Sequence, residues 1–136
     1  MNVTTVNLPD RDGQNIIKDL FNGAWCRGAR IGGAGMPPLS LLYAATAARA
    51  DGIDPRFVDA VREGLDGDAL ARRLAGTDVL VAHSSNYTLA HDEAVVAGLR
   101  RALGCRVALF GNLDAATANR LVSDGVVDWV CRQDPE

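Results

Sequence analysis

The 136-residue sequence contains little of what marks several specialised classes of protein. It has three cysteines, two histidines and a single lysine, and aromatic residues make up 5% of it. The cysteines are odd in number and lack C-x-x-C spacing, which argues against a disulfide framework, and without paired histidines we expect no metal site. The net charge is −3, and the arginines that supply most of the positive charge are scattered. This pattern argues against nonspecific nucleic-acid binding.

Long apolar runs are also missing. None approaches the roughly 20 residues that cross a bilayer, and the N-terminus lacks the basic start and apolar core of a signal peptide. We therefore expect a cytoplasmic protein with no membrane partner. The length suits one domain, residues 1–136, which can bury roughly two-thirds of its unfolded surface.

What is present is an alternation of short apolar runs with amphipathic stretches. Short uninterrupted apolar runs on either side of an amphipathic helix are typical of parallel strands buried on both faces. We expect strands at 3–8, 56–60, 78–82, 106–110 and 126–130, and helices at about 13–22, 38–50, 67–75, 88–104 and 114–125. With right-handed crossovers this order predicts an α/β fold: a single five-stranded parallel sheet in the flavodoxin-like (Rossmann-like) order 2-1-3-4-5, with helices on both faces.

Finer expectations follow from individual residues. Thr88 and Asp114 stand where they can cap helices, and Gly104 and Gly125 stand where helices end. Cys105 and Cys131 lie inside or beside expected strands, so we expect both to be small buried residues.

Residues 9–36 depart from this regular pattern. Connections between strands and helices are normally a handful of residues, and a longer one is often functional. This segment follows the first strand, so it belongs to the carboxyl edge of the sheet, where α/β proteins bind ligands. We expect it to face the loop 83–87 across the switch point between strands one and three.

Catalysis by a serine nucleophile can be imagined from Ser84 and Ser85 with His83 and either Asp78 or Asp92. There is no G-x-S-x-G motif, however, and His83 would point away from its neighbouring serine in an extended strand. A serine-lined binding rim is the better interpretation.

Three other chemistries are weakly supported. The glycines at 32–35 are separated from the first strand by more than twenty residues, whereas a dinucleotide fingerprint turns directly from strand to helix. A phospho-acceptor site would need an aspartate where His83 stands and a lysine after the last strand, but the only lysine is Lys18. Metal ligation by the two histidines would need partner ligands at suitable spacing, and none occur. We therefore expect His83 to be a hydrogen-bonded residue at a strand end and His91 to lie on a helix surface.

Taken together, several segments resemble the N-terminal cobalamin-binding-type domain that precedes the catalytic barrel in a large class of radical S-adenosylmethionine enzymes. The resemblance covers the whole chain through segments that are individually loose but occur in the family's order. They are Leu8-Pro9; Met36-Pro37-Pro38-Leu39-Ser40-Leu41-Leu42-Tyr43-Ala44-Ala45; Asp59-Ala60; Ser84-Ser85-Asn86-Tyr87-Thr88; Gly111-Asn112, where the family usually has Gly-Gly; and Val126-Val127-Asp128-Trp129-Val130-Cys131-Arg132 leading to Glu136.

The resemblance implies that cobalamin lies over the carboxyl edge of the sheet. Its nucleotide tail would pass Ser84, Ser85 and Tyr87 on one side and Gly111 and Asn112 on the other. The lower corrin face would be approached by three residues of the long loop, Gly33, Gly35 and Met36. A radical S-adenosylmethionine barrel carrying a 4Fe-4S cluster, in a methyltransferase or a related radical enzyme, is the implied partner.

Two departures from the family limit these implications. Cobalamin proteins with a histidine as lower cobalt ligand carry D-x-H-x-x-G after the first strand, where this chain reads Asp10-Arg11-Asp12-Gly13-Gln14-Asn15. We therefore expect any bound cobalamin to lack a histidine ligand from this loop. No C-x-x-x-C-x-x-C cluster motif occurs, so the barrel is absent and we expect no catalysis by this domain alone. Two alternatives stay open: a cofactor-free scaffold of the same family that mediates partner or substrate contacts, and a small flavodoxin-like enzyme or nucleotide binder.

Overall fold

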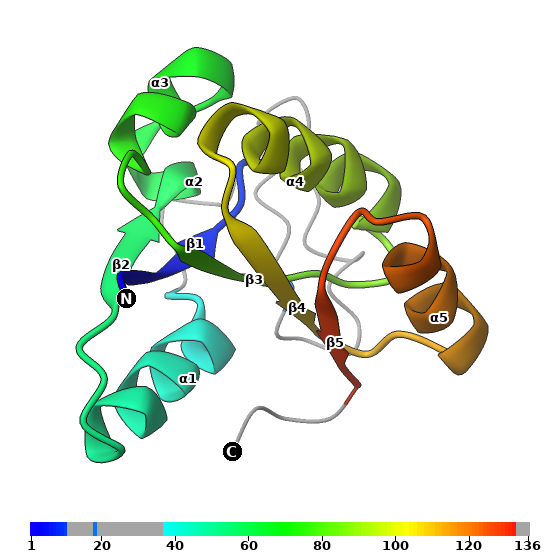
Figure 1. Cartoon of the computed structure of the whole chain (residues 1–136), viewed down its shortest axis with the longest axis horizontal. Helices are drawn as coiled ribbons and strands as arrows, with labels where there is room; N and C mark the ends of the chain where they lie inside the picture. Colours follow the sequence, from blue (N-terminus) through cyan, green and yellow to red (C-terminus); the bar gives the residue numbers. More distant parts are fainter. Residues whose placement is uncertain (11–17, 19–36, 133–136) are drawn as a thin grey trace, which may run out of the picture.

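The structure is a computed structural model that describes residues 1–10, residue 18 and residues 37–132. The strands are β1 (Val3–Asn7), β2 (Arg56–Asp59), β3 (Val79–His83), β4 (Arg106–Phe110) and β5 (Trp129–Cys131) (Figure 1). The helices are α1 (Leu39–Ala50), α2 (Ala60–Glu63), α3 (Gly67–Arg73), α4 (Leu89–Leu103) and α5 (Ala115–Ser123). None of these helices combines the length and apolar character needed to cross a membrane.

The five strands form one sheet in the order β2-β1-β3-β4-β5, and every neighbouring pair is parallel. The predicted fold class and strand order are therefore confirmed. The chain passes from β1 to its neighbour β2 through α1, and then from β2 past β1 to β3 through α2 and α3. The switch point thus lies between the carboxyl ends of β1 and β3, as expected for this order.

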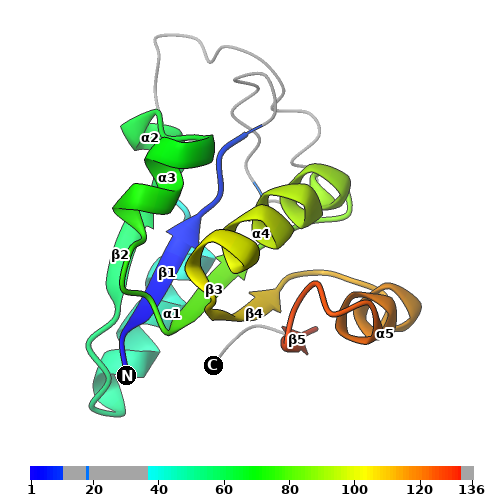
Figure 2. The same cartoon turned by 45° about the horizontal axis from the view of Figure 1, so that its top comes forward.

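The sheet has unequal cover on its two faces. Figures 1 and 2 show α1 on one side of the sheet and α3 and α4 on the other. The main core lies on the side of α3 and α4, where side chains alternate inward along β1, β3 and β4 as a pleated strand requires. Its fully buried members include Val6, Leu70, Leu74, Leu80, Ala82, Val96, Val107 and Leu121. The other face meets α1, whose buried residues are Leu41 and Ala45.

Several element boundaries differ from the sequence prediction, and hydrogen bonding explains two of the differences. The last strand begins at Trp129 rather than at Val126, because the amides of Val126 and Val127 still donate to Leu121 O at the end of α5, at 3.0 and 3.3 Å. The second strand ends at Asp59, whose carboxylate accepts from Arg62 N at 3.2 Å and starts the short helix α2. This short helix was not predicted from the sequence.

The cysteine prediction is half right. Cys105 is 5% exposed and lies in the core, as expected, whereas Cys131 is exposed. Cys131 sits on the edge strand β5 and points to the side of the sheet away from the main core, so the prediction of burial is wrong for it. The helix expected at about 13–22 and the glycine-rich part of the long loop lie outside the described residues, apart from Lys18.

Candidate functional site

The loops that follow β3 and β4 are fastened to each other at the carboxyl edge of the sheet. Ser84 N donates to Phe110 O at 3.0 Å and so extends the ladder by one bond beyond β3. The His83 ring stacks on the Phe110 ring, with centroids 4.7 Å apart and planes within 9° of parallel. The two loops predicted to flank a ligand therefore form one firm unit.

Gly111 has a packing role in this unit. Its φ of +148° is a conformation that residues with side chains rarely adopt, and a Cβ built on it would overlap the backbone carbonyl oxygen of Ser84. The space that the resemblance reserves for a passing ligand is thus filled by the neighbouring loop. Only glycine allows the two backbones to approach this closely.

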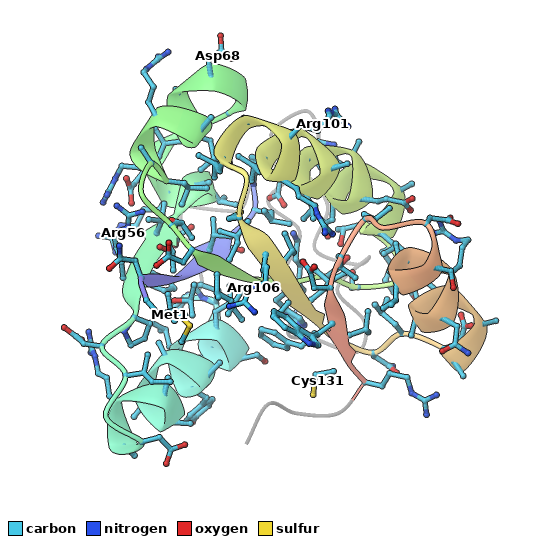
Figure 3. The ribbon with its side chains drawn as sticks, in the orientation of Figure 1. Met1, Arg56, Asp68, Arg101, Arg106 and Cys131 are labelled. Atoms are coloured by element: carbon cyan, nitrogen blue, oxygen red, sulfur yellow. The ribbon has the colours of Figure 1, made fainter. Side chains whose placement is uncertain are left out.

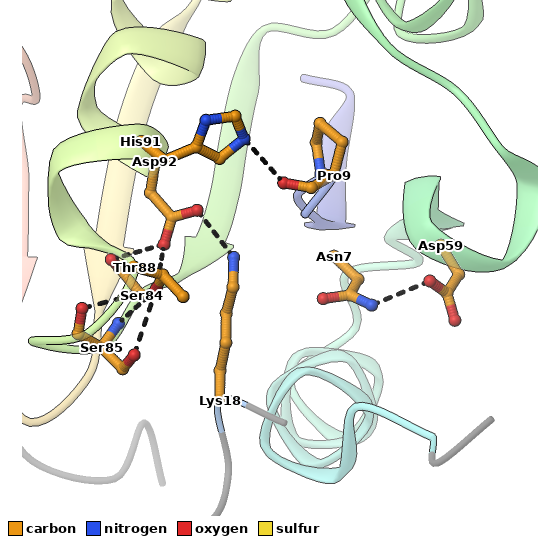
Figure 4. A network of polar contacts seen from close by, with 9 residues as sticks. All are labelled: Asn7, Pro9, Lys18, Asp59, Ser84, Ser85, Thr88, His91 and Asp92. Carbon is orange, nitrogen blue, oxygen red and sulfur yellow. Dashed lines mark hydrogen bonds and ion pairs between the residues drawn. The ribbon is translucent and has the colours of Figure 1, made fainter. Parts of the chain in front are cut away.

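Ser84 points inward and is fully buried. Its hydroxyl donates to Asp92 Oδ2 at 2.7 Å, and the Thr88 hydroxyl donates to the same oxygen at 2.6 Å. Because the Ser84 proton is committed to a carboxylate and not to a histidine, the arrangement is not that of an activated serine nucleophile. It holds the loop after β3 onto the first turn of α4 (Figure 4).

Asp92 is the centre of this network. It is 0% exposed, yet carries a carboxylate, and its second oxygen accepts from Lys18 Nζ at 2.8 Å. The side chains of Lys18 and Asp92 are only 4% and 1% exposed. A buried carboxylate with two hydroxyl donors, an ammonium partner and a place in the first turn of a helix is well compensated.

The same network braces the switch point. Lys18 stands between β1 and α1 in the sequence, and its bond to Asp92 joins this residue to α4 across 74 positions. Nearby, His91 Nε2 lies 3.1 Å from Pro9 O, directly after β1 (Figure 4). His91 is therefore half-buried and bonded rather than a plain helix-surface residue. The bond to a carbonyl requires a proton on Nε2.

The accessible polar groups of the edge are Ser85, at the margin of this network, and two residues outside it. Ser85 is half-buried, and its hydroxyl lies 3.1 Å from that of Thr88. Tyr87 is 54% exposed, and Asn112, on the neighbouring loop, is exposed as well. The edge thus offers a hydroxyl, a phenol and an amide, which are neutral groups that donate and accept hydrogen bonds.

The carboxyl ends of β1 and β2 are also hydrogen-bonded to each other. Asn7 Nδ2, at the end of β1, donates to Asp59 Oδ1 at 2.8 Å at the end of β2. Asp59 also caps α2. These groups hold the ends of two neighbouring strands together and, like Ser84, are engaged within the chain.

The structure brings together five of the eight residues expected at the site and reveals others that the sequence analysis missed. Ser84, Ser85 and Tyr87 lie on one loop with Gly111 and Asn112 beside them, whereas Gly33, Gly35 and Met36 lie outside the described residues. Lys18 and the role of Asp92 as a hub were missed.

One capping expectation also fails. Thr88 occupies the N-cap position of α4, but its side chain makes no cap bond because the hydroxyl turns to Asp92. Asp114 does cap α5, accepting from Thr117 N at 2.9 Å. An acidic residue four positions after a threonine was the available signal for the Thr88–Asp92 contact.

Among the described residues, no three histidine, cysteine or acidic side chains gather as metal ligands would. Comparisons of the chain with protein-family models, with curated proteins and with solved structures found no match.

Proposed function

We propose that this chain is the cobalamin-binding module of a radical S-adenosylmethionine enzyme, a methyltransferase or a related radical enzyme, and holds the corrin over the carboxyl edge of the sheet. The observation that carries the proposal is the joined pair of loops after β3 and β4. They stand beside the switch point of a 2-1-3-4-5 parallel sheet, which is where this architecture binds ligands.

The residues at this edge divide into two groups when the fit to cobalamin is considered. Ser85, Tyr87 and Asn112 are accessible and can contact a nucleotide tail through a hydroxyl, a phenol and an amide. Ser84 and Gly111 are buried and engaged with Asp92 and with each other's loops. Their contribution is to fix the position of the contacting loops, since preorganised loops reduce the entropy lost on binding.

No histidine of the chain stands ready to coordinate cobalt. The sequence has two histidines. His83 is 7% exposed and its ring is stacked on Phe110, and His91 is bonded to Pro9 O. When bound, cobalamin would supply cobalt-centred group transfer to a partner barrel that carries S-adenosylmethionine and a 4Fe-4S cluster. This chain would bind and orient it without a histidine ligand.

A specific observation favours the second candidate, a cofactor-free scaffold of the same family. The Lys18–Asp92 pair and the His91–Pro9 contact fill part of the switch point with the chain's own side chains. A scaffold gains stability from such filling, whereas a binding site must leave room above it. The two candidates differ in one measurable property, which is saturable binding of a corrin.

The experiment is an absorbance and calorimetric titration of the full chain with hydroxocobalamin. We expect a dissociation constant in the micromolar range. Asn112→Trp should weaken binding by at least about tenfold by placing an indole on the edge, and its matched control Asn119→Trp, at an exposed site on α5, should not. Tyr87→Ala should likewise weaken binding, whereas its control Tyr43→Ala, at another exposed tyrosine, should not.

The outcomes separate the candidates. Binding that is lost in Asn112→Trp and kept in Asn119→Trp supports the module. Failure of the folded wild-type chain to bind, with normal circular dichroism and a cooperative melt, overturns it in favour of the scaffold. A tryptophan at Gly111 is unsuitable as a probe, because it would disrupt the loop packing itself.

A further inference from the structure

Among the described residues, the helices cover one face of the sheet only in part. On the side away from the main core, α1 packs mainly on β1 and β3. The side chains beyond it remain accessible: Val79, Val81 and Ala108 are half-buried, Arg106 is exposed and Trp129 is 47% exposed. These five residues define the open face. Figure 3 shows Arg106 on the side of the sheet away from α4.

The open face is continuous across three strands. The parallel register aligns Val81 with Ala108 and Ala108 with Trp129, and it aligns Val79 with Arg106. The Arg106 guanidinium carbon lies 5.3 Å from the centroid of the Trp129 ring. All-parallel sheets are almost always covered on both faces, because their strands are apolar on both. This row of aliphatic and aromatic side chains therefore marks a contact surface rather than a solvated one.

We propose that the open face is the docking site for one amphipathic helix of a partner domain, with an apolar stripe and an acidic side chain directed at Arg106. The width supports a single helix. Strands are about 4.8 Å apart, so β3 to β5 spans about 10 Å, which is the diameter of one helix and the usual spacing of a helix from its neighbour.

The length of the strands sets the length of the helix. β3 and β4 have five residues each, or about 17 Å, which matches roughly eleven residues of helix. Three helical turns present an apolar stripe at positions i, i+3, i+4 and i+7, enough to cover Val81, Ala108 and the accessible part of Trp129.

The positive charge of Arg106 on the open face indicates that the partner helix carries a carboxylate. Arg106 is the single charged residue in β1, β3, β4 and β5. A second copy of the chain would bring the same face, with another arginine and no carboxylate in these strands, and burial of a guanidinium without a counter-ion is costly. A helix with a carboxylate over Arg106 resolves this cost and leaves the cation in place on Trp129.

The test uses two synthetic 18-residue helical peptides with the same leucine and alanine stripe. One has glutamate beside the stripe and the other has lysine. Each is titrated into the ¹⁵N-labelled full chain, and the amides of Val81 and Ala108 and the Trp129 indole are followed by NMR. The net charge of −3 favours the basic peptide at long range, so preference for the acidic one can only come from a local cation.

We expect saturable shifts confined to the open face, with the acidic peptide bound about fivefold more tightly, as one partly desolvated ion pair provides. Arg106→Glu should reverse this preference, and Tyr43→Lys on α1 should leave both affinities unchanged. No shift with either peptide at millimolar concentration, shifts elsewhere on the chain, or a dimer by sedimentation that protects Trp129 would overturn the proposal. None of these results depends on cobalamin.

Discussion

Replacement of Asp92 by asparagine is the most direct test of the network that braces the switch point. The substitution keeps the shape of the side chain but removes the charge that compensates Lys18. The two side chains are 1% and 4% exposed and their charged atoms are 2.8 Å apart. The ammonium of Lys18 would then be left in the interior without the carboxylate that Asp92 provides.

The size of the effect follows from what is lost. Removing one partner of a buried ion pair costs about 3–5 kcal/mol, because the remaining charge stays desolvated. The hydroxyls of Ser84 and Thr88 also exchange a carboxylate acceptor for an amide, a weaker one. We therefore expect a loss of about 4 kcal/mol, which is a large part of the roughly 5–15 kcal/mol that stabilises a domain.

The assay is urea unfolding at pH 7, followed by circular dichroism. With an m-value of about 2 kcal/mol per molar, the midpoint should fall by about 2 M. Lys18→Met should cost less, since Asp92 keeps two hydroxyl donors and the helix N-terminus. The double variant should be more stable than the sum of the single effects predicts, by about 2 kcal/mol.

The matched control is Asp54→Asn. Asp54 pairs with Arg49 at 2.9 Å, but the side chains are 88% and 61% exposed, so solvent screening leaves the midpoint almost unchanged. If Asp92→Asn cost no more than Asp54→Asn, or if the effects at Lys18 and Asp92 were additive, the two groups would not form a buried pair and the reasoning would be refuted.

Three further outcomes can be checked on the same chain. Gly111→Ala should destabilise it by more than about 2 kcal/mol, because a Cβ there overlaps a backbone carbonyl, whereas Gly98→Ala, in helix α4 with open space around it, should be neutral or stabilising by up to about 1 kcal/mol. Hydrogen bonding from Arg120 lowers the pKa of Glu93, so its contribution is present above the ordinary pKa of a glutamate and lost as pH falls through the lower folded value; the melting temperatures of wild type and Glu93→Gln should therefore differ at pH 7 and converge at acidic pH. Burial raises the pKa of the Cys105 thiol, so iodoacetamide should alkylate it in urea but not in buffer, as mass spectrometry of tryptic peptides would reveal.

The fold was predictable from the sequence because the local apolar pattern and the order of the elements along the chain point to the same arrangement. Apolar runs such as 107–110 are short and uninterrupted, and most of them alternate with helical segments that have a regular apolar face. The order of these elements leaves few right-handed arrangements. The boundaries were less predictable: Val126 and Val127 have strand propensity, yet their amides bond to the end of α5, and tertiary context decides such cases.

The candidate site was predictable only in outline. Chain order places Ser84 and Gly111 at the carboxyl edge. It does not show that the Ser84 hydroxyl turns inward to Asp92, or that the backbone of Ser84 occupies the space beside Gly111. The contact between Lys18 and Asp92 spans 74 positions, and no local periodicity encodes such a pairing. The available hint was compositional, since Lys18 is the only lysine among fourteen basic residues.

The two proposed surfaces share strands, and their positions are linked. Val81 and Ala108 of the open face are followed two residues later, on the same side of β3 and β4, by the stacked pair His83 and Phe110. That pair lies at the base of the loops whose accessible groups form the candidate ligand edge. A helix docked along the open face would therefore end beside this edge and bring the rest of its domain over it. If the chain is the cobalamin-binding module proposed above, this placement would turn a ligand held at the edge toward the partner domain that carries out the chemistry.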